Sequence, residues 1–463
     1  MKFGLVAATV VAAVLPLGLW ASPAGADYAP SKGDVIGVGS DTLQYMIDFM
    51  ADGDAYGDPG YNNLGNKNKV VSFDATADAN ARLAYGVDGG QAAQTTCTPG
   101  TGSTAGTGNA TGTNAGFPCV LNPTIVLRSG LQPVQRPNGS GAGFKALVQD
   151  IVAKDNASTA TNGSNAEVIN FSRASSTQTT TAVMPGSEQV DQLSLATDTL
   201  PMLETTTPVS HAVALSAAQL ALIYAANTGS CLTWNDPRIG GTSTDAIIPI
   251  VPQVGSGTRT YFLGQIGLSS VGSCTVVGEE NDPTALAATS SPADAIEPIS
   301  QGRLDVFKGV NNVGTSGGIG GYFLDPSCAY LSAVGACGSG TVSAGTWVTN
   351  AVAPAVQPIT GTPGGSVAGS LFDPTRTLYM YFRNTDIIST TAFQPGTSEN
   401  WLNTLFYDPC ESGQTCTGPG GIYGPSGAPY IQSSAGQTLL EDAGVSPVTS
   451  EACVEITNGN AAC

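Results

Sequence analysis

Residues 215–259 contain three informative runs, which read Leu215-Ser-Ala-Ala-Gln-Leu-Ala-Leu-Ile-Tyr224, then Leu232-Thr-Trp-Asn-Asp-Pro-Arg-Ile239, then Ile248-Pro-Ile-Val-Pro-Gln-Val-Gly-Ser-Gly-Thr-Arg259. The first run predicts a helix over 217–227, because Ser216 and Gln219 have the spacing of a capping box. The last run predicts a strand over 247–251, a Gly-Ser-Gly-Thr turn and a helix over 258–266. This order of elements indicates layered α/β structure.

Two further turns of the same kind occur upstream. Residues 37–42 and 138–143 are Gly- and Ser-rich, and each leads into a run with apolar residues at helical spacing. At such a junction the free backbone N–H groups and the positive end of the helix dipole face one point. A Ser or Thr hydroxyl adds a donor, and glycine allows close approach of a ligand. Three such turns predict an oxyanion site, although each alone is also a common helix cap.

The rest of the chain continues the alternation of short strands and helices. We expect strands over 35–38, 124–127, 168–171 and 378–382, and helices over 42–50, 143–152 and 399–405. The Gly- and Thr-rich segments 95–116 and 341–370 are typical of surface loops. A chain of 463 residues with 41% hydrophobic residues can build about two domains or lobes with real cores.

The charge balance excludes one large class of function. Only 11% of the residues are charged, and the net charge is −19. A protein this acidic lacks the basic surface that nucleic-acid binding requires, so no nucleic-acid partner is expected. An acidic protein can still bind an anion, because local donors act at short range.

The N-terminus predicts export. Lys2 precedes an apolar run over 3–14, and Ala24-Gly25-Ala26 forms a small-residue cleavage site, so residues 1–26 are expected to be a signal peptide. The apolar run is shorter than the ~20 residues that cross a bilayer, so no membrane span is expected after cleavage. No cysteine stands at the cleavage site for lipid attachment. We therefore expect a secreted, cell-surface or periplasmic protein.

The ten cysteines agree with an oxidising compartment. They lie as near neighbours in the sequence, and the simplest pairing joins Cys97 with Cys119, Cys231 with Cys274, Cys328 with Cys337, Cys410 with Cys416, and Cys453 with Cys463. Sequence alone leaves other pairings open. A metal site is not expected, because no Cys-x-x-Cys occurs and His211 is the only histidine. No cofactor is expected either.

The three runs quoted above resemble the PstS-type phosphate-binding proteins of ABC transporters in their order of helix, Trp-Asn-Asp-Pro, strand, Ser-Gly-Thr and helix. Residues 37–42, 140–143 and 171–175 resemble further turns of that family, and 437–447 its closing helix, so the resemblance spans about 34–447. It implies a periplasmic-binding-protein fold, in which two α/β lobes enclose a ligand cleft. Lobe one would comprise residues 34–201 and 299–463, and lobe two residues 202–298.

The resemblance also implies which residues contact phosphate. The matched positions are Thr42, Ser140, Gly141, Ser256, Gly257 and Thr258, and Ser40 competes with Thr42 because this turn is one residue longer. The chain departs from the family where an Arg and an Asp precede Ser-Gly-Thr, since Pro252 and Val254 stand there. It departs again after the strand over 168–171, where Ser175 stands at the position of an Asp in the family. Arg173 or Arg259 could supply the missing cation, and Asp41 the missing carboxylate.

The expected function is therefore that of a non-enzymatic, exported solute-binding protein for a tetrahedral oxyanion, phosphate first, with an ABC permease as partner. Two alternatives stay open at this point. A secreted hydrolase could use Ser256, although Gly-Ser-Gly is not the Gly-x-Ser-x-Gly elbow of such enzymes. A surface protein could have kept the fold without a transport function, as the missing lipid anchor favours.

Overall fold

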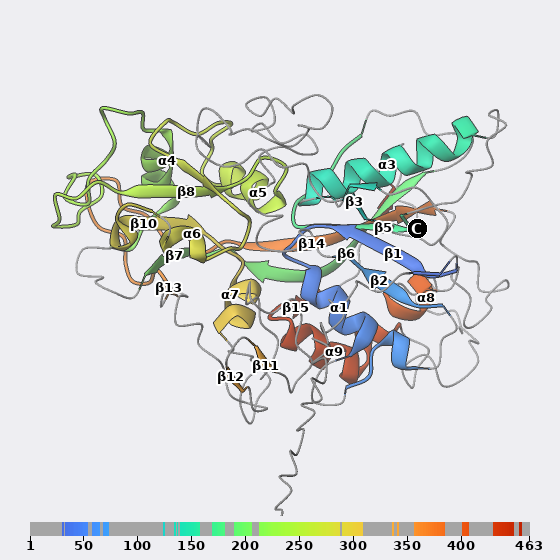
Figure 1. Ribbon diagram of the computed structural model, residues 1–463. Helices are drawn as coiled ribbons and strands as arrows, with labels where there is room; N and C mark the ends of the chain where they lie inside the picture. Colours follow the sequence, from blue (N-terminus) through green and yellow to red (C-terminus); the bar gives the residue numbers. More distant parts are fainter. Residues whose placement is uncertain are drawn as a thin grey trace, which may run out of the picture.

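The computed structural model describes residues 30–31, 33–53, 58–64, 68–73, 124–125, 134–135, 137, 139–157, 169–180, 189–205, 213–287, 289–308, 336–337, 340–341, 356–384, 401–406, 429–448 and 453–455. Within these ranges, two sheets carry helices on both faces (Figure 1). The expected signal peptide, the loop over 95–116 and His211 lie outside the described residues.

The first sheet has the order β15-β6-β14-β5-β1-β2, and β16 also pairs with β6. Its strands are β1 (Val35–Gly39), β2 (Val70–Ser72), β5 (Phe171–Ala174), β6 (Val190–Thr199), β14 (Thr375–Arg383), β15 (Ser446–Pro447) and β16 (Cys453–Glu455). β1 runs parallel to β2 and β5, whereas β14 runs antiparallel to β5 and β6. The turns after β1 and β5 therefore meet at one edge of this sheet.

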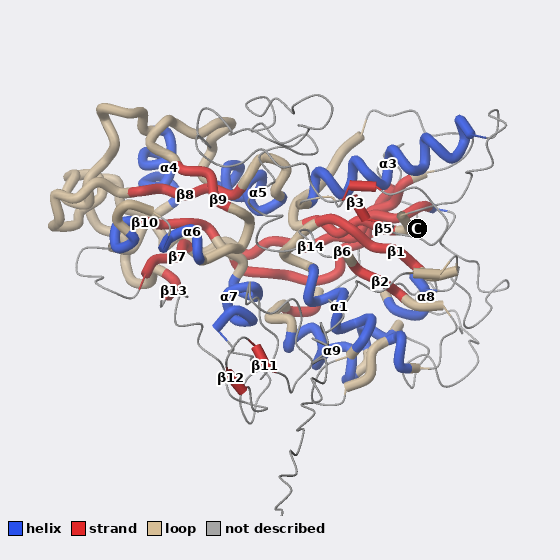
Figure 2. Tube along the Cα trace, in the orientation of Figure 1, coloured by secondary structure: helices blue, strands red, loops and turns tan. Residues whose placement is uncertain are grey.

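Helices cover both faces of the first sheet, with α3 (Ser140–Ala157) on one face and α1 (Gln44–Asp52), α8 (Trp401–Leu405) and α9 (Ser434–Asp442) on the other (Figures 1 and 2). Side chains alternate along β1, so Val35 packs toward α1 while Ile36 and Val38 pack toward α3. Burial on both faces is the reason that β1 is apolar along its length.

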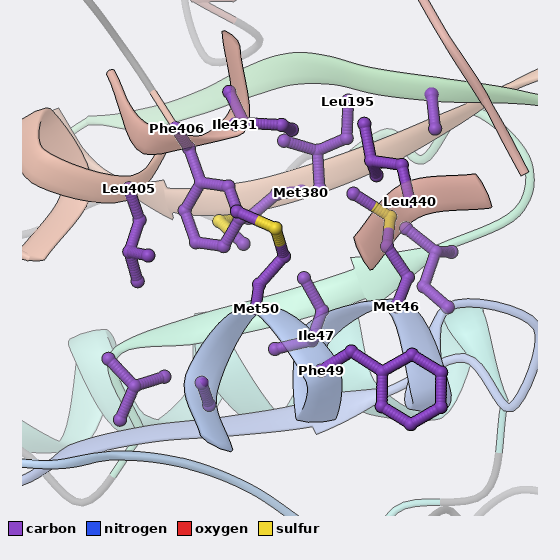
Figure 3. Close-up of a cluster of buried hydrophobic side chains, with 14 of the residues drawn as sticks. Met46, Ile47, Phe49, Met50, Leu195, Met380, Leu405, Phe406, Ile431 and Leu440 are labelled. Carbon is purple, nitrogen blue, oxygen red and sulfur yellow. The ribbon is translucent and has the colours of Figure 1, made fainter. Parts of the chain in front are cut away.

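The larger cluster of this sheet is rich in methionine. Figure 3 shows Met46 and Met50 of α1 pointing toward the strand that carries Met380, with Leu440 of α9 beside Met46. Methionine fills irregular gaps between a helix layer and a twisted sheet because its side chain is unbranched and adaptable. This core holds the start of α1 against the sheet, and so positions the turn that precedes it.

The second sheet has the order β13-β7-β10-β8-β9. Its strands are β7 (Met202–Thr205), β8 (Ile248–Pro252), β9 (Val276–Gly278), β10 (Ala295–Pro298) and β13 (Val356–Pro358). Helices α4 (Ala217–Ala225) and α5 (Gly257–Gln265) pack on one face, and α6 (Thr284–Ala287) packs on the other beside Leu304 of α7 (Gln301–Lys308). β8 is parallel to β9 and β10, so α5 follows β8 at the edge that faces the first sheet.

The remaining described elements are short. Two small antiparallel pairs join β3 (Thr124–Ile125) to β4 (Val134–Gln135) and β11 (Ala336–Cys337) to β12 (Gly340–Thr341). Three turns of 3-10 helix cover Tyr61–Asn63, Pro292–Asp294 and Tyr430–Gln432. Among the described helices none is long and apolar enough to cross a membrane.

The chain passes between the two sheets at crossovers that lie side by side. The N–H of Leu200 donates to the carbonyl of Pro374 at 3.0 Å, and the N–H of Ile299 donates to that of Pro201 at 3.1 Å. This arrangement confirms the predicted α/β class with two lobes. The residue boundaries of the lobes stay a proposal with one amendment: β13 pairs with β7, so residues 356–374 go with the second sheet although we expected them in lobe one.

Several local predictions are confirmed. The capping box of α4 is present: the N–H of Gln219 donates to Ser216 Oγ at 3.3 Å, and the N–H of Ser216 to Gln219 Oε1 at 2.8 Å. Cys231 and Cys274 form a disulfide. Each of the other four predicted pairings includes at least one cysteine outside the described residues, so these pairings stay predictions.

One strand is displaced from its prediction. We expected it over 168–171, but β5 covers Phe171–Ala174 because it takes its register from β1, with Gly37 opposite Phe171 and Gly39 opposite Arg173. The apolar run before it does not reveal this long-range pairing. As a consequence, Arg173 lies inside a buried strand instead of in the turn after it.

Candidate functional site

The three Gly- and Ser-rich turns meet where the two sheets face each other. Thr42 lies between β1 and α1, Ser140 begins α3, and Ser175 follows β5, so the first sheet supplies all three. From the second sheet come Thr258, in the first turn of α5, and Glu280, just after β9. Ser140, Thr258 and Glu280 are completely buried, as is Ser175.

Four hydrogen-bond donors converge on one oxygen atom, Oε1 of Glu280. Thr258 donates through its hydroxyl at 2.7 Å and through its backbone N–H at 3.3 Å. Thr42 Oγ1 donates at 3.3 Å and Ser175 Oγ at 3.4 Å. The donors belong to three chain segments and to both sheets. The backbone N–H of Thr258 adds the positive end of the α5 dipole.

A chain of serine hydroxyls lies behind this oxygen. Ser140 Oγ accepts the N–H of Ser175 at 2.9 Å and lies 3.3 Å from Ser175 Oγ, to which Ser40 Oγ donates at 3.2 Å. The two helix starts touch here, since a Cβ added to Gly257 would lie 2.2 Å from Ser140 Oγ. The N–H of Gly141 also donates to the carbonyl of Gly255 at 3.0 Å. Glycine is required at position 257 by this close approach.

Arg376 of β14 brings a positive charge to the site. Its Nη1 donates to Thr258 Oγ1 at 2.8 Å, and its Nη2 lies 3.4 Å from Thr42 Oγ1. The guanidinium is held by Asp198 of β6, whose Oδ2 accepts from Nη2 at 2.8 Å and from Nε at 3.0 Å. Asp198 Oδ1 in turn accepts from Ser300 Oγ at 3.0 Å. Both partners of this ion pair are buried at the crossovers.

A second buried ion pair flanks the site. Asp41 Oδ1 lies 3.3 Å from Nη2 of Arg303, whose guanidinium stacks over the ring of Tyr45 at 4.0 Å. Asn281 connects this pair to the site, because its Nδ2 donates to Asp41 Oδ2 at 3.3 Å and to Thr42 Oγ1 at 3.1 Å. Asp41 therefore lies one layer behind the hydroxyl groups and neutralises Arg303.

The Glu280 carboxyl is in an environment that disfavours its charge. Burial raises its pKa above the ordinary value, and the negative charge of Asp41 raises it further. The hydrogen bonds from Thr258 and the charge of Arg376 act in the opposite direction but do not outweigh burial. The site thus combines strong local donors for an anionic oxygen with no contact to water, a setting in which such hydrogen bonds are strong.

The structure brings together most of the residues that the sequence predicted. Around Glu280 Oε1 and the serine chain lie Ser40, Thr42, Ser140, Gly141, Ser175, Gly257 and Thr258. Their role in binding a ligand stays a prediction. Their convergence follows from the turns lying at facing edges of the two sheets.

Besides Asp41, which pairs with Arg303 behind the hydroxyl groups, three predicted residues point elsewhere. Arg173 donates to the carbonyls of Ser40 at 3.0 Å and Phe73 at 2.8 Å, so it holds the turn after β1 from behind. Ser256 caps α5 by accepting the N–H of Arg259 at 3.0 Å. The guanidinium of Arg259 donates to the carbonyl of Pro252 at 2.8 Å. These hydrogen bonds direct Arg173 and Arg259 to backbone carbonyls and not to the hydroxyl groups of the site, so they do not support the prediction that either residue supplies the cation.

Sequence reasoning missed Arg376 and Glu280. Arg376 lies two residues before the apolar run over 378–382, and only the pairing of β14 with β6 sets it opposite Asp198. Glu280 stands in the acidic run Glu279-Glu280-Asn281-Asp282, which reads as an exposed loop. A polar residue next to a predicted strand end is the one signal that could have indicated either.

No protein-family model matches the chain, and no curated protein matches its sequence. A search of solved structures finds an ABC-type phosphate transport receptor from Vibrio cholerae, 13% identical, covering 77% of this chain and 90% of that one with a TM-score of 0.36. It also finds a protein from Clostridium perfringens that is described as a phosphate ABC transporter substrate-binding protein with bound phosphate. That protein is 10% identical, and the match covers 90% of this chain and 100% of that one with a TM-score of 0.41.

A third structure, described as a possible phosphate binding protein from Planctomyces limnophilus, is 11% identical and covers 91% of this chain and 94% of that one with a TM-score of 0.33. All three are of the class that the sequence motifs resemble. Identities and TM-scores this low transfer no ligand to this chain, so a function has to be argued from the geometry of the site.

Proposed function

We propose that this protein binds a tetrahedral oxyanion, phosphate first, between its two sheets and acts as a solute-binding protein. The observation that carries the proposal is the convergence of four donors from three chain segments on the single anionic oxygen Oε1 of Glu280. A site that accommodates one carboxylate oxygen in this way has the donor set for an oxygen of phosphate.

The chemistry of the donors favours an oxyanion over other solutes. They are hydroxyl groups, a backbone N–H at a helix start and the guanidinium of Arg376, all of which bond well to anionic oxygen. The four donors to Oε1 of Glu280 come from both sheets and meet at one position, which suits a single anionic oxygen of a ligand held between the sheets. The buried ion pairs of Arg376 and Arg303 fix the surroundings without adding a free positive charge.

The wider setting of the function is part of the same proposal. The signal peptide predicted over 1–26 supports a location outside the cytoplasm, and the proposed partner in uptake is an ABC permease. A role in hydrolysis is not favoured, since Ser256 Oγ serves as the cap of α5. Detection of the expressed protein in the culture medium or the cell envelope, and not in the cytoplasm, tests the location. Co-purification with a membrane permease tests the partner.

Thermal unfolding in the presence of different anions tests the binding itself. Phosphate, arsenate, sulfate, molybdate and tungstate are compared at matched ionic strength. An anion present at 100 times its dissociation constant stabilises the folded state by about 2.7 kcal/mol. We expect phosphate to raise the unfolding temperature most. If none of the five anions raises it beyond chloride, the proposed function is wrong.

The Thr258 hydroxyl provides the sharpest mutational prediction. Thr258→Val keeps the shape of the side chain and removes a donor at 2.7 Å from the anionic oxygen. Calorimetric titration should show phosphate affinity falling by about 1.5–3 kcal/mol, the contribution of a hydrogen bond to a charged group. The matched control is Thr260→Val, because Thr260 lies in the same helix but is exposed and donates to the carbonyl of Ser256. Equal affinities in both variants would place the ligand elsewhere.

A further inference from the structure

Glu280 occupies the point where the donors of the site converge. Its side chain is fully buried, and Oε1 takes all four hydrogen bonds. An oxyanion oxygen and this carboxylate oxygen cannot share that position. We propose that Glu280 is an internal ligand, which fills the anion site when no solute is bound and competes with the oxyanion for it. This inference rests on the proposed function.

The carboxylate fits the site only in part. Oε2 of Glu280 is buried and has no hydrogen-bond partner among the described residues, and the same holds for Nη1 of Arg303. A buried polar atom without a partner is unfavourable. The internal ligand is therefore one that a better-matched anion can displace.

The same contacts connect the two halves of the molecule. Thr258 belongs to the second sheet with Glu280, whereas Thr42 and Ser175 belong to the first. Oε1 thus bridges the sheets in the way that a bound solute would. Neighbouring bonds hold the backbone of this turn in place: the N–H of Glu280 donates to Gln253 Oε1 at 2.7 Å, and Asn281 Oδ1 accepts the N–H of Ser300 at 2.9 Å. Release of Oε1 therefore involves the side chain of Glu280, or separation of the sheets, while this turn stays attached.

Competition has a measurable consequence. The apparent dissociation constant of a solute rises in inverse proportion to the fraction of molecules in which the site is free. Removal of an internal ligand that fills most of the sites therefore tightens solute binding. Removal of a residue that helps to hold the solute weakens it. The direction of the change in affinity distinguishes these two roles of Glu280.

The experiment titrates phosphate into the wild type, Glu280→Gln and Glu280→Ala, with Glu279→Gln as control. Glu279 is the adjacent residue with the same charge but is only half-buried. We expect Glu280→Ala to bind phosphate about tenfold more tightly or better, as for a site at least nine-tenths occupied in the wild type. Glu280→Gln keeps the size of the side chain and is therefore the variant that better preserves the fold. Its phosphate affinity should also be higher than that of the wild type. Glu279→Gln should match the wild type. Weaker binding by both Glu280 variants overturns the inference and leaves the proposed function standing.

Acetate separates failure of the inference from failure of the proposed function. In Glu280→Ala, acetate can place a carboxylate oxygen where Oε1 was, so it should raise the unfolding temperature of this variant and not that of the wild type or of Glu279→Gln. If no protein in the series binds phosphate, the proposed function fails. Stabilisation of Glu280→Ala by acetate would still support the role of Glu280 as an internal ligand. If acetate does not stabilise this variant, that role is overturned.

Discussion

At the scale of single residues, the buried polar and charged side chains of the site form one hydrogen-bond network. Glu280 and Asp41 are both buried within the same hydrogen-bond network, which Asn281 and Thr42 connect. Two carboxyl groups in such surroundings resist being charged together unless donors and guanidinium groups offset their repulsion. Thr258 and Arg376 provide that offset in part, but burial first and the charge of Asp41 second keep the pKa of Glu280 above its ordinary value.

This raised pKa predicts how stability depends on pH. The folded protein binds the Glu280 proton more tightly than the unfolded chain, whose pKa is near 4.5. The resulting stabilisation is complete below the unfolded pKa and is lost as the pH rises from about 4.5 through the higher folded value. Glu280→Gln cannot lose a proton, so the free energy of unfolding of the wild type minus that of the variant should fall across this window.

Urea denaturation at a series of pH values measures the difference. The other charged groups near Glu280, chiefly Asp41 and Arg376, are present in both proteins, so their contributions largely cancel. A difference that stays constant or grows with pH would contradict the raised pKa.

At the scale of elements, the site depends on how closely the starts of α3 and α5 approach each other. Gly257 and Gly141 lie in the first turns of these helices, and the contact leaves no space for a Cβ at Gly257. Tight contact between helix starts brings their free N–H groups toward one point, which neither helix could achieve alone.

Gly257→Ala should therefore disrupt the site, because the added Cβ would lie 2.2 Å from Ser140 Oγ and 2.4 Å from Ser175 Oγ. We expect loss of phosphate binding together with a lower unfolding temperature. Gly264→Ala is the matched control in the same helix, since a Cβ there meets nothing within 4 Å. The control should raise stability by about 0.5–1 kcal/mol, because alanine favours the helix over glycine. Equal behaviour of the two variants would contradict the close contact.

The Cys231–Cys274 disulfide ties the segment after α4 to the segment before β9, across 43 residues of sequence. Replacing both cysteines by serine should lower the free energy of unfolding by about 2–4 kcal/mol, mainly because the unfolded chain loses a constraint. Chemical denaturation under non-reducing conditions measures the loss. The described polar contacts of the two cysteines are with the carbonyls of Asn227 and Ala226 and not with the network around Glu280, so phosphate affinity at a temperature where the variant is folded should stay unchanged. A variant as stable as the wild type would show that the bridge closes a loop already ordered without it.

At the scale of the whole molecule, the site lies where the crossovers pass between the sheets. Asp198 and Arg376 stand directly opposite each other on β6 and β14, the two long strands that extend toward the second sheet (Figure 1). Ser300, just after the return crossover, donates to Asp198. The ion pair therefore connects the crossovers to the donors of the site.

Asp198→Asn should remove the counter-charge of a fully buried guanidinium and destabilise the fold by about 3–5 kcal/mol, as expected when one partner of a buried ion pair is lost. Denaturation by urea measures this loss, and calorimetry on the folded variant should show weaker phosphate binding because Arg376 is no longer held. Asp236→Asn breaks the pair with Arg238, which is 44% exposed, and should change stability far less. A similar effect of both substitutions would show that the buried pair contributes little.

The sequence by itself determined the features that depend on residues close together along the chain. The capping box of Ser216 and Gln219, the Gly- and Ser-rich turns before α3 and α5, and the disulfide between Cys231 and Cys274 were all predictable. Spacing alone reveals such features, because their partners are neighbours in the sequence or are drawn from a short set of alternatives. The same local signals indicated the α/β class and most of the polar residues that meet at the site.

Only the tertiary structure decided which charged groups reach the site. From the sequence, Arg173 was the better candidate for the cation of the site, because it follows a predicted strand. The register of β5 against β1 instead sets its guanidinium among backbone carbonyls. Arg376 came to the site because β14 pairs with β6, nearly two hundred residues away in sequence, and Glu280 because the edges of the two sheets face each other. The energy of a buried charge depends on every group within a few ångströms of it, and those groups come from distant parts of the chain, so no local pattern records it.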